Sequence, residues 1–446
     1  MSNISQTKLS LNTRTLQLGP LRLKIYQLWV FFLAGLTVLF GVSTSEMGYT
    51  VRPERLLVVA WLIFFLPLLS LSFIRIWDNF RVRKILILLL FWLMCGLLSS
   101  LDSVEPSASF RHWVDLSLAV MFLFLVLSVK PVRLIRDRQN AILWLAILLG
   151  LGGVLAAVLR HFNLVGDDSV WSFFIGEEIG YFRVRMTMLE PNLYGAVMMV
   201  LALLTIAELR VSNNIFSKLS FIAAHLGLLL SFSRGPIVGY IIGLVIFLLL
   251  MGYKRLFKGI ALFLFVGLLT MLIVGLNSSE KKGPESVLNR YSSVSTRLTF
   301  LQLAIPDILE SPFFGNGVYS FSFMHPEAPH MVGSETEGNA WLPSLPLNIL
   351  YDNGLIGLAL LGSFFYLLLR SGYRAIKYAR PRFVDSRILC RAAGWLVSGI
   401  ALLVSSLATP TYSLAFFWGV MAIVYNIPRA IQMLENQDVN TILDRK

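Results

Sequence analysis

The sequence predicts an all-α protein, a polytopic bundle of membrane-spanning helices that forms a single domain over residues 1–446. Of its 446 residues, 56% are hydrophobic and only 14% are charged, and the mean hydropathy is +0.72. Many of its apolar runs approach the roughly 20 residues that an α-helix needs to cross a bilayer. This composition is typical of a multi-spanning membrane protein.

Hydropathy along the chain predicts about twelve spans. The first 24 residues are polar and basic, and the apolar run after them is long enough to span. We therefore expect that run to remain as a span and not to be removed as a signal peptide. The predicted spans cover residues 25–42, 56–74, 85–101, 113–129, 141–159, 193–207, 216–230, 236–251, 256–276, 345–369, 392–408 and 414–427.

The distribution of charge predicts the orientation of the bundle. Most of the 38 Lys and Arg residues fall in alternate connections, above all in the basic connection at 370–391, whereas most of the 25 acidic residues fall in the others. By the positive-inside rule, both termini lie in the cytoplasm, and the long connections 160–192 and 277–344 lie outside the plasma (inner) membrane. The net charge of +13 reflects this topology and predicts no nucleic-acid partner.

A short polar turn, SFSRG at residues 231–235, separates two long apolar runs. Gly235 can serve as an N-cap and Pro236 suits the first position of a helix, so a helix is predicted to begin at Pro236. Its N-terminus offers backbone N–H groups and the positive end of the helix dipole, to which Arg234 adds a planar set of donors. The turn is suited to bind phosphate or pyrophosphate. The alternative is that Arg234 extends to a lipid headgroup at the membrane surface.

The first long external connection, 160–192, carries charged residues of two kinds. Acidic pairs stand at 167–168 and 177–178, but adjacent carboxylates without regular spacing are typical of a solvated loop, so we predict no metal site. Arg183 and Arg185 alternate as in a strand or an extended loop, just before an EPN turn that leads into the next span.

The second long external connection, 277–344, contains an amphipathic pattern. Leu298, Leu301, Ile305 and Ile308 fall on one face of a helix. A helix lying on the membrane surface or on the bundle fits this pattern better than a span.

Candidate acids and bases follow that helix. His330, Glu335 and Glu337 stand in a stretch rich in Pro and Gly, and their spacing matches no zinc pattern. Asp352 falls inside an otherwise apolar span, where ionisable residues usually face a cavity or a partner. These four residues are the candidates for a catalytic acid or base.

Four segments between about residues 181 and 360 stand in a distinctive order: R…EPN, SFSRGPIVG, STRLTFLQLAIPDILESPFFGNG and NILYDNGLIGL. With them the chain resembles the O-antigen ligase and polysaccharide polymerase superfamily of bacterial membrane proteins. The resemblance implies a GT-C-like glycosyltransferase that uses an undecaprenyl-diphosphate-linked glycan at the outer face of the plasma membrane. It also implies inversion of the donor's anomeric carbon, with no metal and no other cofactor. Arginines then neutralise the departing pyrophosphate.

The resemblance assigns pyrophosphate binding to particular arginines. The arginine that precedes the EPN turn falls on Arg183, with Arg185 as a second candidate, the turn arginine on Arg234, and the arginine of the second external connection on Arg297.

One position departs from the ligase pattern. Ligases of this group carry a His-Asn pair before the GLIG span, and here that pair is replaced by Pro343 and Ser344. The base for the acceptor hydroxyl is then sought among His330, Glu335, Glu337 and Asp352.

These observations favour a polymerase of lipid-linked glycan repeat units. An O-antigen ligase or protein O-oligosaccharide ligase of the same superfamily is the alternative, which the missing His disfavours. A secondary transporter is the alternative from another class, because it can also have about twelve spans and a buried Asp, although the chain shows no internal repeat. The expected partners are the glycan donor, a glycan acceptor, membrane lipids and a chain-length regulator protein.

Overall fold

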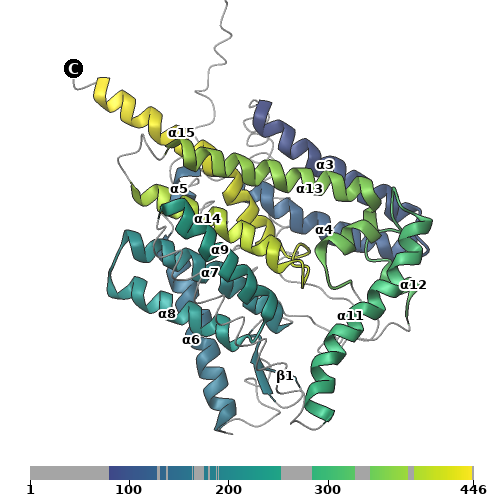
Figure 1. Cartoon of the computed structure of the whole chain (residues 1–446). Helices are drawn as coiled ribbons and strands as arrows, with labels where there is room; N and C mark the ends of the chain where they lie inside the picture. Colours follow the sequence, from purple (N-terminus) through teal and green to yellow (C-terminus); the bar gives the residue numbers. More distant parts are fainter. Residues whose placement is uncertain are drawn as a thin grey trace, which may run out of the picture.

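The computed structural model describes residues 80–127, 131–136, 139–162, 164, 175–178, 181–186, 188, 190–252, 284–326, 342–379 and 386–443. Helices make up most of these ranges, which confirms the predicted all-α membrane class (Figure 1). The helices are α3 (Phe80–Leu101), α4 (Pro106–Leu127), α5 (Pro131–Arg136), α6 (Gln139–His161), α7 (Pro191–Val211), α8 (Ile215–Leu230), α9 (Arg234–Met251), α11 (Pro284–Glu310), α12 (Phe321–Met324), α13 (Leu345–Ala379), α14 (Ser386–Ser405) and α15 (Ala415–Leu443).

A small hairpin is the element that hydropathy missed. Strands β1 (Ile175–Glu178) and β2 (Tyr181–Val184) pair antiparallel, with Ile175 opposite Val184. The alternation of Arg183 and Arg185 predicted an extended segment here, and β2 confirms it for Arg183.

Nine of the predicted spans coincide with helices, whereas those at 25–42, 56–74 and 256–276 lie outside the described residues. Seven of the described helices are long and apolar enough to cross a membrane. They are α3, α4, α6, α7, α9, α13 and α14. Helix α8 is apolar but has only 16 residues. The total of about twelve spans therefore stays a prediction.

Helix α7 is the core of the bundle. In its most apolar window 83% of the residues are buried, against 28% for α9, because α6, α8, α9 and α14 pack around it. Pro191 starts α7, where the missing N–H of proline would have no acceptor within the helix. The N-terminus of α7 lies next to the turn that precedes α9, because Ser233 of that turn donates to Asn192.

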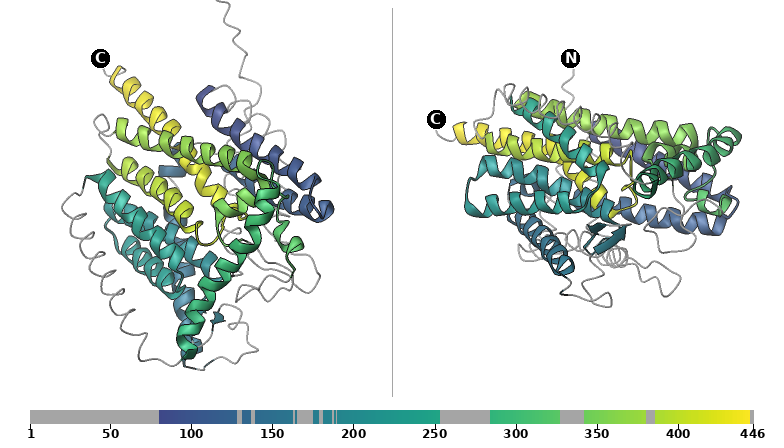
Figure 2. Two further views of the ribbon diagram at one scale, coloured as in Figure 1. Left: turned by 45° about the vertical axis from the view of Figure 1, so that its right-hand side comes forward. Right: turned by 60° about the horizontal axis from the view of Figure 1, so that its bottom comes forward.

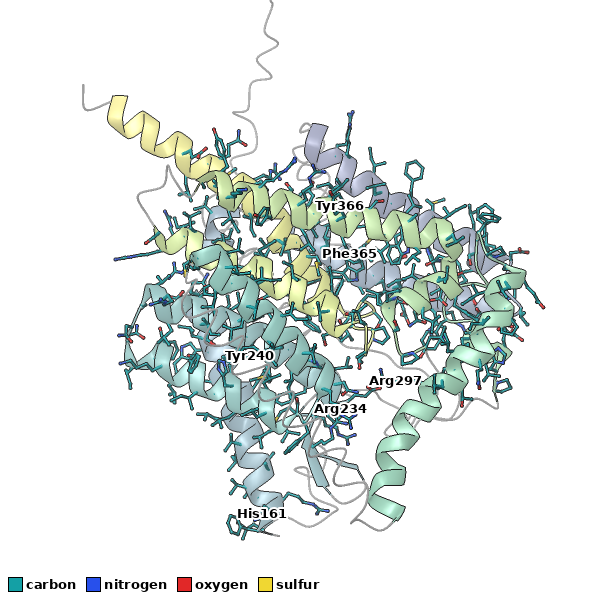
Figure 3. All side chains as sticks on the ribbon, in the orientation of Figure 1. His161, Arg234, Tyr240, Arg297, Phe365 and Tyr366 are labelled. Carbon is teal, nitrogen blue, oxygen red and sulfur yellow. The ribbon has the colours of Figure 1, made fainter. Side chains whose placement is uncertain are left out.

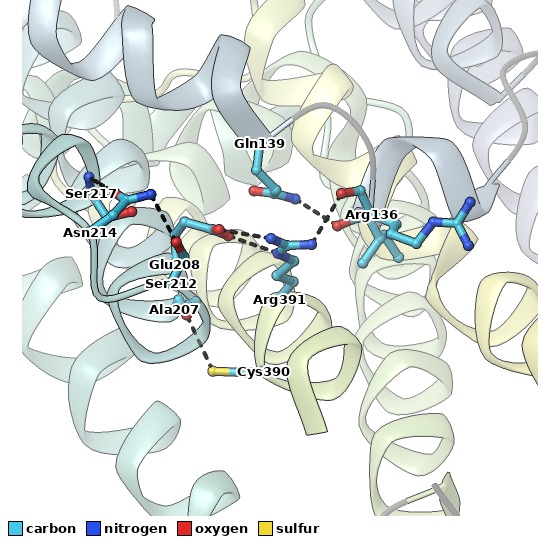
Figure 4. Close-up of polar contacts among 10 residues, drawn as sticks. Arg136, Gln139, Ala207, Glu208, Ser212, Asn214, Ser217, Cys390 and Arg391 are labelled. Atoms are coloured by element: carbon cyan, nitrogen blue, oxygen red, sulfur yellow. Dashed lines mark hydrogen bonds and ion pairs between the residues drawn. The ribbon is translucent and has the colours of Figure 1, made fainter. Parts of the chain in front are cut away.

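An ion pair joins α7 and α14 at the end of α7 farthest from that turn (Figure 4). Arg391 donates from Nε and Nη2 to the two carboxylate oxygens of Glu208, each at 2.7 Å, and from Nη1 to the carbonyl of Arg136 at 3.1 Å. Such a bidentate pair is geometrically specific, and because Glu208 is 4% exposed, loss of Arg391 would leave a buried charge. Cys95 and Cys390 are buried free thiols.

Helix α13 is broken at Gly354, where φ is 63° and ψ is −167°. The loop that follows α11 fills the break. The N–H groups of Asn316 and Gly317 donate to the carbonyls of Tyr351 and Asp352 at 2.8 and 3.1 Å, and the N–H of Leu355 donates to the carbonyl of Pro312 at 2.8 Å. The backbone groups that the break would leave unpaired are thus satisfied by this loop. The GNG and DNG segments are two sides of one joint, which we call the α13 joint (residues 312–317 and 351–355).

Helix α11 crosses the ends of α9, α13 and α14 instead of running beside them (Figures 1 and 2). The helix predicted from the amphipathic pattern is confirmed, but its buried face is formed by Phe300 and Ala304, both 0% exposed. Leu298, Leu301 and Ile305 are 54, 38 and 45% exposed. Ile308, the fourth predicted residue, packs against the cluster that contains Phe300, whereas the other three face away from the bundle, as a helix on a membrane surface would require. Pro306 lies inside the helix, nine residues after Arg297.

The α13 joint generates a stability prediction. A Cβ at Gly354 would lie 2.3 Å from the backbone carbonyl of Phe313, and the positive φ disfavours any other residue. Gly354→Ala should lower the free energy of unfolding by about 2 to 4 kcal/mol, seen as a lower melting temperature of the detergent-solubilised protein. Gly362→Ala on the same helix is the matched control, because no atom lies within 4 Å of its Cβ position. Equal melting temperatures for the two variants would contradict the described joint.

Candidate functional site

The turn before α9 is the centre of the site. Helix α8 ends at Leu230 and α9 begins at Arg234, with Ser233 as the N-cap. The predicted start at Pro236 with Gly235 as N-cap was therefore wrong by two residues. Proline is tolerated throughout a first helical turn, whose N–H groups have no acceptor within the helix, so Pro236 does not mark the first residue. Arg234 is itself the first helical residue, at the positive end of the dipole.

Arg183 supports this turn from behind. Its side chain is 7% exposed, and it donates from Nε to the carbonyl of Ser231 at 3.0 Å and from Nη2 to Oδ1 of Asn192 at 2.9 Å. Ser233 donates from Oγ to the same Asn192 oxygen at 2.8 Å. Arg183 thus joins its own hairpin to the first turn of α7 and to the turn before α9. Arg185, two residues on, is half-buried.

Arg297 comes to the same place from α11. It donates from Nη2 to the carbonyl of Ala408 at 3.1 Å, and Figure 3 shows its side chain near that of Arg234. Burial, and then the positive charge of Arg234, lower the pKa of Arg297. Arg234 is exposed and forms no hydrogen bond or ion pair with any described residue, and no described carboxylate pairs with Arg297. Two neighbouring guanidinium groups without a counter-charge favour binding of an anion.

Backbone strain gathers around these residues. Three non-glycine residues of the described ranges have positive φ: Met186 at 49°, Phe232 at 47° and Tyr319 at 66°. The first follows Arg185, the second precedes Arg234, and the third contacts Asp352. Strained residues of this kind persist where surrounding structure holds them, and they cluster at binding and active sites.

Asp352 is part of the α13 joint and is 2% exposed. The N–H of Tyr319 and Oη of Tyr412 donate to its carboxyl group, whose Oδ1 has no hydrogen-bond partner among the described residues. Burial and the charge of Asp352 hold the pKa of Tyr412 well above its ordinary value, so Tyr412 remains a donor. The structure places this predicted acid-base candidate in the interior of the protein.

The connection between α14 and α15 is a part of the site that sequence reasoning missed. Its Ala408 accepts the hydrogen bond from Arg297, and its Tyr412 donates to Asp352. Ser405, Ser406, Thr409 and Thr411 are also buried here. Such a run of small polar residues between apolar helices was the signal available in the sequence.

A second missed group lies at the far end of α11. His325 Nε2 and Tyr351 Oη contact the same oxygen of Asp307, at 2.7 and 2.6 Å. An aspartate that orients a histidine is an arrangement found in general-base catalysis, and here it also joins α11, α12 and α13. Sequence spacing could not pair Asp307 with His325, because 18 residues and a loop separate them.

The other predicted acid-base candidates, His330, Glu335 and Glu337, lie outside the described residues. Asp167 and Asp168 lie outside them as well. Within the described ranges, no three His, Cys, Asp or Glu side chains are grouped as metal ligands.

Comparison with known proteins bears on this geometry. Residues 219–362 match the family model described as O-Antigen ligase. This segment is similar to the O-antigen ligase family. It covers less than half of the chain and contains Arg234, Arg297, Asp307, His325 and Asp352. No curated protein matches the chain.

The match confirms the superfamily that the sequence motifs indicated. The described apolar helices are those of an integral membrane protein, and the family that the matched segment resembles implies a lipid-linked glycan donor and an acceptor. The supporting arginine, Arg183, lies outside the matched segment.

The arginine pair generates a binding prediction. Inorganic pyrophosphate should raise the melting temperature of the purified protein, because an anion between Arg234 and Arg297 relieves their repulsion. Arg234→Ala and Arg297→Ala should each weaken pyrophosphate binding about 10- to 100-fold, as expected for lost hydrogen bonds to a charged group. Arg370→Ala is the control, because Arg370 is an exposed arginine in the second half of α13 that stacks on Tyr366. Equal protection of all variants would show that the arginine pair does not bind pyrophosphate.

Proposed function

We propose that the protein is a glycosyltransferase that polymerises glycan repeat units carried on undecaprenyl diphosphate, at the outer face of the plasma membrane. The observation that carries the proposal is the meeting of Arg234 and Arg297, from distant segments, without a described counter-charge. The diphosphate of a lipid-linked donor supplies the missing negative charge. The O-antigen ligase match supports the choice of a lipid-linked glycan.

The proposed reaction is a single displacement. The hydroxyl oxygen of an acceptor sugar attacks the anomeric carbon of the donor from the side opposite the diphosphate, and inverts it. The bond between that carbon and the phosphate oxygen breaks, and the diphosphate leaves with its electron pair. Because negative charge grows on the leaving oxygen, Arg234 and Arg297 stabilise the transition state more than the ground state.

A base must take the proton of the acceptor hydroxyl. His330, Glu335, Glu337 and Asp352 are the candidates from the sequence, and the His325–Asp307 pair is the one that the structure adds. Asp352 is the least accessible of the described candidates. For a sugar hydroxyl, an imidazole that is oriented by an aspartate is better suited than a carboxyl group that is 2% exposed.

The position of the ligase His bears on the choice between the two activities of the superfamily. It is occupied by Pro343, which is buried and has no proton-accepting side chain. This supports polymerisation over transfer to lipid A core or to protein. Ligation remains the second candidate, and it differs in the acceptor and not in the use of the donor.

The turn arginine gives the first test of the proposal. Arg234→Ala should reduce transfer about a hundredfold or more, comparable with loss of one strong electrostatic stabiliser in other enzymes. Arg234→Lys should recover only part of this, because an ammonium keeps the charge but loses the planar donors. The measurement is the glycan ladder of cells that contain each variant at matched membrane abundance, beside Arg297→Ala and the control Arg370→Ala. A normal ladder from Arg234→Ala would remove the turn from the active site.

The second test concerns metal. Since arginines supply the positive charge, transfer by the purified enzyme should persist in excess chelator. Loss of activity in EDTA, restored by Mg²⁺ or Mn²⁺, would contradict the proposed role of the arginines and favour the carboxylates at 167–168 and 177–178 as ligands.

A further inference from the structure

Asn192 lies where the first turn of α7 meets the turn before α9. Its Oδ1 accepts from Arg183 Nη2 at 2.9 Å and from Ser233 Oγ at 2.8 Å. Gly195, one helical turn further along α7, allows this approach, because a Cβ there would lie 2.8 Å from Ser231 Oγ. Asn192 therefore occupies the contact between two helix N-termini, those of α7 and α9.

The two hydrogen bonds fix which way the amide group points. A guanidinium group has only donors, so the carboxamide oxygen, and not its nitrogen, must face Arg183. The two donors occupy both lone pairs of that oxygen. The nitrogen, Nδ2, has two N–H groups of its own, and none of the described residues accepts a hydrogen bond from it.

The exposure of the surrounding residues shows where Nδ2 lies. Arg183, Ser231 and Ser233 are buried, whereas Asn192 is only half-buried and Arg234 is exposed. Because the oxygen of the amide group faces the buried residues, its nitrogen points away from them, and Arg234 directly follows the Ser233 that bonds to this amide. Two neutral donors are thus added to the charged donors of Arg234 and to the positive ends of two helix dipoles.

We infer that Asn192 Nδ2 donates a hydrogen bond to the diphosphate of the lipid-linked donor, and that Arg183 acts mainly as the residue that positions Asn192 and the turn. This inference rests on the proposed function. Arg183 uses Nε and Nη2 within the protein, so it contributes its charge and its support, whereas Asn192 and Arg234 contact the ligand. A phosphate oxygen is the acceptor that this set of donors matches.

The test uses two substitutions in the full chain, with inorganic pyrophosphate as the probe and titration calorimetry as the measurement. Asn192→Thr keeps an oxygen that can accept from Arg183 and Ser233 but removes Nδ2 without adding charge. Its affinity for pyrophosphate should be about tenfold lower than that of the wild-type protein. Asn192→Asp is isosteric and pairs well with Arg183, but it places a negative charge at the anion site, so its affinity should fall further.

The control is Asn214→Asp, the same substitution at the N-cap of α8, where the side chain accepts from the N–H of Ser217. It should bind pyrophosphate as the wild-type protein does. If Arg234→Ala loses pyrophosphate binding while both Asn192 variants keep wild-type affinity, the inference is overturned and the proposed function stands. If Arg234→Ala also keeps wild-type affinity, the proposed function itself fails. Failure of both Asn192 variants to fold would assign this residue a structural role and would equally overturn the inference.

Discussion

The repulsion between Arg234 and Arg297 is the constraint on which the arrangement of the site depends. Two guanidinium groups stay close together only if the segments that carry them are held firmly. Arg234 is held because Arg183 and Asn192 fix the turn before α9, and Arg297 is held because α11 is attached to the bundle at the α13 joint and at Ala408. The energy of folding is thus used to keep positive charge in a place that an incoming diphosphate can neutralise.

Charged residues are few in this chain, but those that are buried hold its helices together. In an apolar bundle, every buried polar group needs a partner, so those present form connected sets. Glu208 and Arg391 close the bundle at one end of α7, and Arg183, Asn192 and Ser233 organise the other. Helix α7, the most buried of the candidate spans, connects the two sets and keeps its N-terminus at the site.

Sequence reasoning found the parts of the site that a local signal marks. Apolar length gave the helices, and a charged residue in a short turn between apolar runs gave Arg234. Motif order gave Arg183 and Arg297, and the structure brings both to that turn. Sequence reasoning did not find the pairing of Asp307 with His325 or the connection that carries Ala408 and Tyr412. It also did not find the joint between the GNG and DNG segments. Each depends on contacts between segments far apart in the chain, for which a single sequence contains no periodicity.

The apolar stripe of α11 was predicted from the sequence, but the side toward which it faces was not. In a membrane protein, lipid is as good a neighbour for Leu298 as a protein core.

Pro306 has a mechanical consequence for Arg297. A proline within a helix removes one backbone hydrogen bond and allows bending at that point. Pro306 stands between Arg297 and the α13 joint, so the segment that carries the arginine is an arm about 14 Å long at 1.5 Å per residue. A change of about 10° at the proline displaces the far end of that arm by about 2 Å, most of the length of a hydrogen bond. Under the proposed function, a slight bend at Pro306 would be enough to bring Arg297 into hydrogen-bond distance of a phosphate oxygen or to move it out.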